Sequence, residues 1–428
     1  MAPALVEILE VALEPDDGGR FAFAAIDRPA VGETNDSTYA LDVRGRVSGK
    51  DEAVTAVELS ARGTPIARIP LPLPSLAGAE QDEGGEGRFY ATIGSLSLPP
   101  RFELRVEAEL ADGERAPVAT IRGRRASLRT RFEPRRQPVM LTSAGRSGTT
   151  VFMRLLEGHP DIAAYPPFEH EPRVATYWLE VLLALSDPAS WLRQIAPAGP
   201  LHEDWWLGRR IPTARRLSRP AIQNWLGSEG VEELGEFCMS RIDAVYDQVA
   251  ALEGGGGERY FAEKFQPDRI PELAWELYSG AREIILVRDL RDMVASIFAS
   301  SAKRGAQELP ADGVGYIAEN VKRRAGAAAG AWRARSDRAL LVRYEDVMLA
   351  PDETLRGVLE YLEIDSSPEA VAAMRAHAED PVVAMERHRT TPDPAASIGR
   401  WRRDLSEELQ EACERTLRDE LRLFGYEG

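Results

Sequence analysis

Cysteine is almost absent from this chain, since Cys238 and Cys413 are the only two. They lie far apart and outside any metal-ligand spacing, so neither a disulfide framework nor a zinc site is expected. Long apolar runs are missing too, because no window approaches about eighteen uncharged apolar residues. The first residues, MAPALVEILEVALEPDD, carry acids early and have no basic stretch ahead of an apolar one. The sequence therefore predicts neither a membrane span nor an export signal, and we expect a cytoplasmic protein.

Positive charge is in short supply: 53 Lys and Arg stand against 69 Asp and Glu, for a net charge of −16. The acids are spread along the whole length, which favours solubility and argues against a partner such as nucleic acid or an anionic membrane. Any anion site must therefore be local. Apolar residues, by contrast, make up 44% of the 428 residues, which is enough for two globular units.

The first 132 residues have the alternation of β-strands. In FELRVEAEL, residues 102–110, every second residue is apolar, which is the period of a strand with one wet face. Similar runs lie at about 4–13, 20–27, 37–48, 54–61, 66–71, 87–96 and 115–123. They predict an all-β, antiparallel sandwich domain over residues 1–132. This region has no histidine or cysteine, so we interpret it as an accessory domain, with acceptor recognition, dimerisation and a purely structural role left open.

Beyond residue 135 the pattern changes to short apolar runs separated by helical stretches. The strand candidates are 139–142, 260–264, 283–288 and 339–344, and the helical stretches are 149–158, 272–279, 292–303 and 353–362. This order predicts an α/β domain over residues 136–428, with a parallel sheet and flanking helices. Sheets of this kind bind ligands beyond the carboxyl ends of their strands.

The stretch LTSAGRSGTT, residues 141–150, follows the first of these strands directly. Gly145 and Gly148 permit positive φ, and the helix after them directs its free amides and positive dipole end at the same point. Arg146 adds a charge that does not titrate. Further hydroxyl donors come from Ser147, Thr149 and Thr150. We interpret the stretch as a P-loop-like phosphate loop, although a purely structural turn remains an alternative.

The loop is not a Walker loop, because it lacks the lysine and is shorter by two residues between its glycines. A second anion element follows the strand at 283–288. Arg288 ends that strand, and Ser296 lies about two turns into the next helix, within reach of a second phosphate. Taken singly, Arg288 could form a strand-end ion pair with Asp289 or Asp292, and Ser296 could be an exposed helix residue. Together with the loop, the two predict a bisphosphorylated nucleotide.

These residues resemble the sulfotransferases that use 3′-phosphoadenosine 5′-phosphosulfate (PAPS), over residues 136–428. The resemblance implies that the loop at 143–150 holds the 5′-phosphosulfate and that Arg288 and Ser296 hold the 3′-phosphate. A late glycine and basic segment that covers the nucleotide in the family is similar to Gly399, Arg400 and Trp401. Two departures are visible. Arg146 replaces a lysine, as in many bacterial and Golgi-type members, and Ala395-Ala396 replaces a basic pair.

The chemistry implied is an in-line displacement, which needs no metal and leaves adenosine 3′,5′-bisphosphate (PAP). Negative charge grows on the leaving phosphate oxygen, where Arg146 and the loop amides can stabilise it. The family places a histidine or glutamate facing the sulfate as the general base. The candidates here are Glu169, His170 and Glu171. The position of Glu171 resembles the acid of bacterial members, while His170 has the more suitable intrinsic pKa, and solvated loop residues are the alternative.

Three further points concern the acceptor side. Lys264 ends another strand, where it could approach the bridging oxygen or the acceptor, or form an ordinary surface pair with Glu263. A helical insertion at about 173–258 holds Trp178, Trp191, Trp205, Trp206 and Trp225. These rings suit either a wall for a carbohydrate or small-metabolite acceptor or a core. Pairing of a sandwich edge would give a homodimer.

Two other functions compete with sulfuryl transfer. A nucleotide- and glycan-binding protein without catalysis would keep the same pocket. A nucleotide kinase with a degenerate phosphate loop would need magnesium and ATP, and the missing lysine counts against it.

Overall fold

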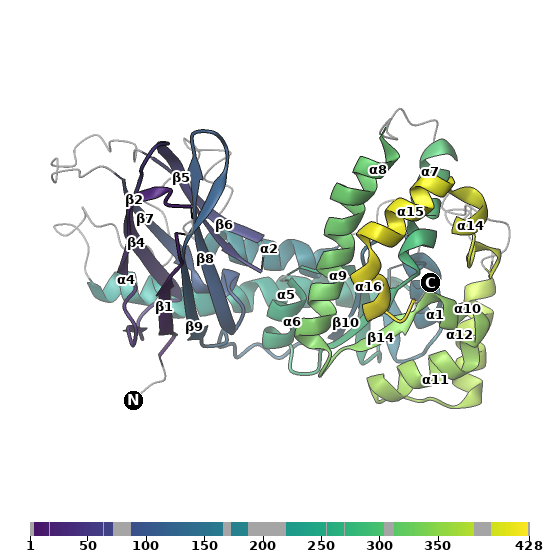
Figure 1. Ribbon diagram of the computed structural model, residues 1–428. Helices are drawn as coiled ribbons and strands as arrows, with labels where there is room; N and C mark the ends of the chain where they lie inside the picture. The colour runs from purple at the N-terminus through teal and green to yellow at the C-terminus, as the bar shows by residue number, and fades with distance from the viewer. Residues whose placement is uncertain are drawn as a thin grey trace. The chain divides into compact units, whose positions relative to one another are not determined.

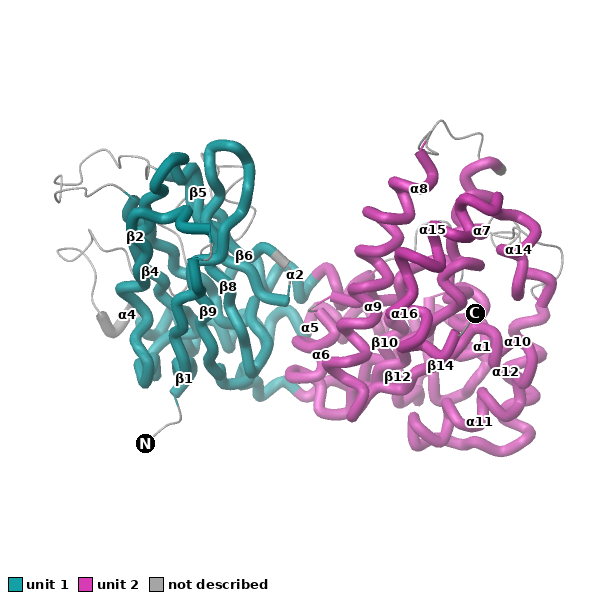
Figure 2. Tube along the Cα trace, in the orientation of Figure 1, with its two compact units in different colours: residues 1–132, 178–239 teal, residues 133–177, 240–428 magenta. Residues whose placement is uncertain are grey.

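The computed structural model describes residues 4–16, 18–62, 64–71, 87–165, 173–186, 220–253, 255–268, 270–303, 312–380 and 395–426. The chain forms two compact units (Figure 2), namely Met1–Phe132 with Trp178–Met239, and Glu133–Tyr177 with Ser240–Gly428. We call the first the β unit and the second the α/β unit. Each is described by itself.

The strands of the β unit form two antiparallel sheets (Figure 1). The larger has the order β3-β1-β9-β8-β5-β6, with β1 (Val6–Leu13), β3 (Thr34–Asn35), β5 (Val54–Ala61), β6 (Thr64–Pro70), β8 (Arg101–Leu110) and β9 (Arg115–Arg125). The smaller has the order β2-β4-β7, with β2 (Phe21–Arg28), β4 (Ala40–Gly49) and β7 (Arg88–Gly94), which leads into the 3-10 turn η1 (Ser95–Ser97). Each expected run coincides with a strand, and β3 is additional.

The core of the β unit follows from the alternation seen in the sequence. In β8, Leu104, Val106 and Ala108 are fully buried, and their neighbours are partly or fully exposed. Val43 of β4 and Ile93 of β7 belong to the same apolar cluster, so both sheets cover one core. Apolar residues every second position thus place one face of each strand inward. The prediction of an antiparallel, β-rich N-terminal region is confirmed.

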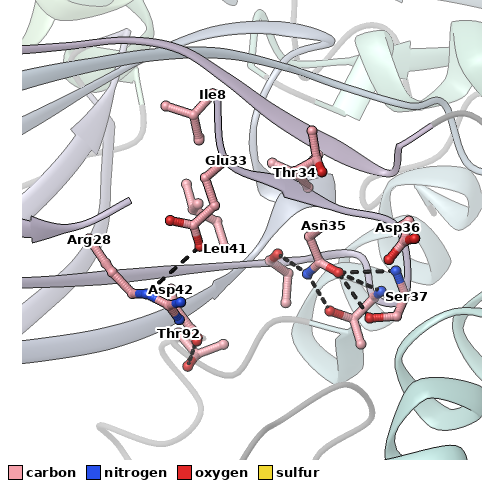
Figure 3. Close-up of a pocket in the computed structure, with 13 residues that line it drawn as sticks. Ile8, Arg28, Glu33, Thr34, Asn35, Asp36, Ser37, Leu41, Asp42 and Thr92 are labelled. Carbon is pink, nitrogen blue, oxygen red and sulfur yellow. Dashed lines mark hydrogen bonds and ion pairs between the residues drawn. The ribbon is translucent and has the colours of Figure 1, made fainter. Parts of the chain in front are cut away.

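A cavity of about 240 Å³ opens in the β unit beside β1, β3 and β4 (Figure 3). Its polar wall is built from side chains that bond to one another: the Asn35 amide donates to Thr38 Oγ1 at 2.6 Å, and Thr92 Oγ1 donates to Asp42 Oδ1 at 2.7 Å. The carboxylates of Glu33 and Asp42 line it as well. Because like charges repel, this wall disfavours a phosphate-bearing ligand.

The helical insertion contributes α2 (Val174–Ser186), α4 (Pro220–Gly227) and α5 (Glu229–Leu252). Its residues 178–239 belong to the β unit. Tyr39 joins them to β4, since its amide donates to Gly227 O at 2.7 Å and its hydroxyl to Glu232 Oε1 at 2.9 Å. Trp178 meets Phe237 edge to face at 5.8 Å. Trp191, Trp205 and Trp206 lie outside the described residues, and the predicted domain limits stay a prediction.

A five-stranded parallel sheet is the centre of the α/β unit (Figure 1). Its order is β11-β12-β10-β13-β14, with β10 (Gln137–Thr142), β11 (Ile162–Ala164), β12 (Tyr260–Phe265), β13 (Arg282–Val287) and β14 (Leu340–Arg343). The four predicted strands are present, and β11 was not expected from the sequence. In β13, Ile284 and Leu286 belong to one apolar cluster, and Ile285 and Val287 belong to another. The sheet is therefore covered on both faces, as predicted.

Helices cover both faces of the sheet. The helices and helical turns of this unit are α1 (Thr149–Glu157), α6 (Ile270–Leu277), α7 (Leu290–Lys303), α8 (Gly313–Tyr316), the π-helical turn η4 (Ile317–Val321), α9 (Lys322–Arg335), α10 (Tyr344–Leu349), α11 (Pro351–Leu362), α12 (Pro368–Glu379), η5 (Ala395–Ser397), α14 (Trp401–Asp404), α15 (Glu407–Thr416) and α16 (Arg418–Leu423). The cluster with Ile284 and Leu286 includes side chains of α1, α11 and α12. The cluster with Ile285 and Val287 includes side chains of α7, α9 and α15. Among the described residues, no helix combines the length and the apolar character needed to cross a bilayer.

Candidate active site

The phosphate loop follows β10, the middle strand of the parallel sheet. Gly145, Arg146 and Gly148 have positive φ angles of 87°, 55° and 84°. Such angles are ordinary for glycine and uncommon for arginine, so the loop holds Arg146 in a conformation that local preference alone does not favour. A Cβ at position 148 would lie 2.3 Å from Cδ2 of Tyr344, so this glycine is also required by close packing.

The loop ends at the amino terminus of α1, which no side chain caps. The first helical backbone bond runs from Phe152 N to Gly148 O at 3.1 Å, which leaves the amides of residues 149–151 without a helical acceptor. The loop is tightened by its own serines: Gly145 N donates to Ser143 Oγ at 3.3 Å, and Ser147 Oγ donates to Gly145 O at 3.2 Å. Amides and the helix dipole therefore converge on one point, as an anion requires.

Arg146 joins the two predicted anion elements. Its Nε and Nη2 donate to Ser296 Oγ at 3.3 and 3.1 Å, across 150 residues of sequence. Ser296 lies in α7 and is 2% exposed, so the alternative of an ordinary exposed helix residue is wrong. The loop after β10 and the helix after β13 thus form one site at the carboxyl edge of neighbouring strands.

Arg288 stands directly after β13 and is 6% exposed. Its guanidinium lies 4.7 Å over the ring of Tyr344, the same ring that packs against Gly148. Nη2 donates to Ser397 O at 2.7 Å, and within the described part of the chain the buried Nε has no hydrogen-bond partner. A buried, unsatisfied cationic donor costs free energy unless a ligand meets it. Arg288 and the loop therefore flank one aromatic ring.

Within the described residues, no ion pair joins Arg288 to Asp289 or Asp292, which was the alternative for this arginine. Asp289 binds Arg291 instead, through two bonds of 3.0 and 2.8 Å. Asp292 accepts the backbone amides of Gly399 and Trp401 at 2.7 and 2.9 Å. Both acids therefore have other hydrogen-bond donors, although the charge of Arg288 still favours the ionised form of Asp292.

Arg400 and Trp401, the late residues of the predicted nucleotide cover, are both 5% exposed. Arg400 Nε donates to Asp404 Oδ2 at 2.6 Å. Two guanidinium groups lie over the Trp401 ring, those of Arg291 at 4.2 Å and Arg402 at 4.3 Å. The backbone of this segment reaches Arg288 through Ser397, whereas direct contacts of Arg400 and Trp401 with a nucleotide stay a prediction.

Lys264 belongs to the site, although the sequence left its role open. Its Nζ donates to Thr150 Oγ1 in the first turn of α1 at 3.1 Å. An ordinary surface pair with Glu263 is wrong, because Glu263 is 1% exposed. Adjacent residues of a strand point to opposite faces, so Lys264 and Glu263 contact different parts of the structure. The sequence signal was the place of Lys264 near the end of a strand, and the pairing of β12 with β10 brings that end beside the loop.

Glu263 holds the start of α2. Its carboxylate accepts the amide of Ala175 at 3.3 and 3.1 Å and the hydroxyl of Tyr246 at 2.6 Å. Burial raises the pKa of Glu263 to about 7, against the opposing effect of these hydrogen bonds. The base candidates Glu169, His170 and Glu171 lie outside the described residues, so their roles stay predictions.

The sequence model of the sulfotransferase family matches residues 138–368 of this chain. Three solved structures are similar over about two thirds of the chain. A sulfotransferase domain from the curacin biosynthetic pathway is 16% identical, with 66% of this chain and 98% of that chain covered and a TM-score of 0.38. Mouse sulfotransferase SULT7A1 in complex with PAP is 14% identical, with 68% and 86% covered and a TM-score of 0.37. A sulfotransferase from Alicyclobacillus acidocaldarius is 15% identical, with 68% and 94% covered and a TM-score of 0.37.

No curated protein sequence matches this chain. The family match begins at the second residue of β10 and includes the phosphate loop, Arg288 and Ser296. It covers more than half of the 428 residues, and the chain therefore belongs to the sulfotransferase family.

Proposed function

We propose that this enzyme transfers the sulfuryl group of PAPS to a hydroxyl of a carbohydrate or a small metabolite. The observation that carries the proposal is the contact of Arg146 with Ser296 at 3.1 and 3.3 Å. It brings together two anion-binding elements that are 150 residues apart in sequence, as a nucleotide with phosphates at both ends of its ribose requires.

The loop and Arg288 divide the phosphates between them. The amides at the start of α1 and the Arg146 guanidinium would hold the 5′-phosphosulfate, and Arg288 with Ser296 would hold the 3′-phosphate. The residues present fit this nucleotide, because α1 has no side-chain cap and the buried Arg288 Nε has no partner among the described residues. Both features are donors that an anion satisfies.

During transfer the bond between sulfur and the bridging phosphate oxygen breaks while a bond forms between sulfur and the acceptor oxygen. Both electrons of the broken bond stay on the phosphate, so negative charge grows at that oxygen. Arg146 and Lys264, the latter fixed 3.1 Å from Thr150, are the cations that would stabilise it. The proton of the acceptor hydroxyl goes to a general base, for which we propose Glu171, with His170 and Glu169 as the alternatives.

We also propose the division of labour within the chain. Residues 136–428 form the sulfotransferase domain, residues 1–132 form an accessory domain, and the insertion at about 173–258 serves the acceptor. Support comes from the bonds that Tyr39 makes to Gly227 and Glu232, which fix part of the insertion to the β-strands. The net charge of −16 argues against a highly sulfated polymer as acceptor.

Calorimetry with PAP in the presence of a chelator tests the nucleotide site. The wild-type protein is expected to bind, and Arg288→Ala should weaken binding about tenfold to hundredfold, because charge-assisted hydrogen bonds are lost. Arg324→Ala, which removes an exposed arginine of α9, is the matched control. Absence of PAP binding to the wild type would reject the proposal.

Transfer of labelled sulfate from PAPS separates the remaining functions. Label on a hydroxylated acceptor supports the sulfotransferase. Nucleotide binding with no transfer across a broad acceptor screen would support a binding protein without catalysis, and magnesium-dependent ATP turnover would support a kinase.

A further inference from the structure

The backbone of residues 397–401 is fastened to the crossover between β13 and α7. Arg288 donates to Ser397 O at 2.7 Å. One turn further on, Asp292 Oδ2 accepts the Gly399 amide at 2.7 Å and Oδ1 accepts the Trp401 amide at 2.9 Å. A cation thus holds a carbonyl of this segment, and a carboxylate holds two of its amides.

The carboxylate of Asp292 is 1% exposed. Its burial raises its pKa, while the amides of Trp401 and Gly399 and the charge of Arg288 act in the opposite direction. A buried carboxylate is unfavourable unless hydrogen bonds compensate for the lost water. Here both oxygens are used by backbone donors, and two bonds from one rigid group fix the orientation of the segment as well as its position.

The segment needs this support. Gly399 has a φ of +70°, a conformation that few residues other than glycine adopt readily. The Trp401 side chain already packs against Arg291 and Arg402, and it anchors only the end of the segment. Asp292 and Arg288 hold the turn between Ser397 and Trp401 at its beginning, middle and end.

We propose that Asp292 is a positioning residue that arranges the segment 397–401 around Arg288 before the nucleotide binds. The proposal rests on the proposed function. Asp292 acts through the amides of Gly399 and Trp401, with no contact of its own to the nucleotide. A segment that is already in place adds no ordering cost to nucleotide binding, so the affinity for PAP depends on this carboxylate.

Asp292→Asn tests the proposal with almost no change of shape. An amide nitrogen in place of one oxygen faces a backbone N–H, so one of the two bonds becomes a contact between donors. The buried contact between donors also lowers global stability, so binding is measured well below the unfolding transition of the variant. If the segment is then correctly placed in about a tenth of the molecules, the Kd for PAP rises about tenfold. Asp292→Ala, which removes both acceptors, should raise it further.

Hydrogen exchange of the free protein supplies a second readout that needs no nucleotide. Peptides containing residues 399–401 should exchange about tenfold faster in Asp292→Asn than in the wild type, and PAP should restore part of the protection. Glu420→Gln is the matched control. This carboxylate of α16 is 6% exposed, accepts Lys322 at 2.8 Å, and makes no contact with the segment.

The outcomes separate the two proposals. Wild-type binding with an unchanged Kd in Asp292→Asn overturns this inference alone, and so does unchanged exchange at residues 399–401 in the free variant. A wild-type protein that does not bind PAP overturns both the proposed function and this inference.

Discussion

The two units of the molecule differ in where they keep their charged side chains. In the β unit, ion pairs lie on the outer faces of the strands: Arg122 and Glu10 are 47% and 49% exposed, at 2.8 Å. In the α/β unit, Arg335 and Glu283 form a pair of 2.7 Å with 1% and 0% exposed. Exposed pairs such as Arg356 with Glu360 occur in the α/β unit too, but among the described residues only this unit has ion pairs with both partners buried.

This difference indicates where function resides. Charges on exposed strand faces are solvated and screened, and they contribute little beyond solubility. Buried charges are costly, so they persist where geometry or ligand binding requires them. In the α/β unit the buried acids Glu263 and Asp292 and the buried Arg288 all act at the carboxyl edge of the sheet or beside it. The largest effects of substitution are expected there.

Glu283→Ala should give the largest loss of stability. Glu283 accepts Arg335 through two bonds of 2.7 and 3.0 Å, and it also accepts Thr142 Oγ1 at 2.6 Å. Removing Glu283 leaves the buried Arg335 with only the longer pair to Glu272 at 3.6 Å, and the loss of one partner of a buried pair typically costs about 3–5 kcal/mol. Chemical denaturation should show this in the transition of the α/β unit.

The matched control for this substitution is the double variant Glu283→Leu, Arg335→Met. Because it removes both charges of this pair, it should recover part of the loss, reduced by the cost of taking Arg335 away from the buried Glu272. A cost below about 1 kcal/mol for Glu283→Ala, the range of an exposed pair, would remove the contrast between the two units.

The buried set could be predicted only in part. The loop at 143–150 and Arg288 were predicted because each directly follows an apolar strand, and Ser296 because it comes eight residues after Arg288, which are patterns that short windows of sequence contain. The strands of the β unit were found for the same reason, since alternation of period two is local. β11 was not found, because three residues, Ile162–Ala164, are too few to show a period.

The residues that escaped prediction owe their roles to contacts distant in sequence. From the local sequence, Asp292 is expected to form a salt bridge. In the structure it accepts hydrogen bonds from Gly399 and Trp401, which lie 107 and 109 residues away. Glu263 reads as half of a surface pair, because nothing in YFAEKF indicates that Tyr246 and Ala175 cover it. Packing of this kind depends on the whole fold, so local sequence carries no signal for it.

The pH dependence of stability should show the second-largest effect, through Glu263. Burial raises the pKa of this acid from 4.5 to about 7, so the folded protein holds its proton more tightly than the unfolded chain does. The contribution of Glu263 to stability is therefore greatest at low pH. It falls by about 3 kcal/mol at most between about pH 4.5 and 7, and it is constant above pH 7.

In Glu263→Gln this fall should be absent, since the amide does not ionise. The comparison is the difference in Tm between wild type and variant from pH 5 to pH 8, with Glu420→Gln as the control for a buried carboxylate changed to an amide. A difference that stays constant across this range would show that Glu263 titrates normally.

Arg122→Ala in β9 should have the smallest effect. Arg122 bridges Glu10 at 2.8 Å and Glu103 at 3.0 Å, and all three side chains are between 41% and 49% exposed. Exposed pairs contribute little to stability and salt screens them, so the change in unfolding free energy should be close to the experimental error and shrink further at high ionic strength. A large loss of stability at low salt would mean that exposed cross-strand ion pairs stabilise the β unit as much as the buried pair stabilises the α/β unit. The contrast between exposed and buried charge would then not hold.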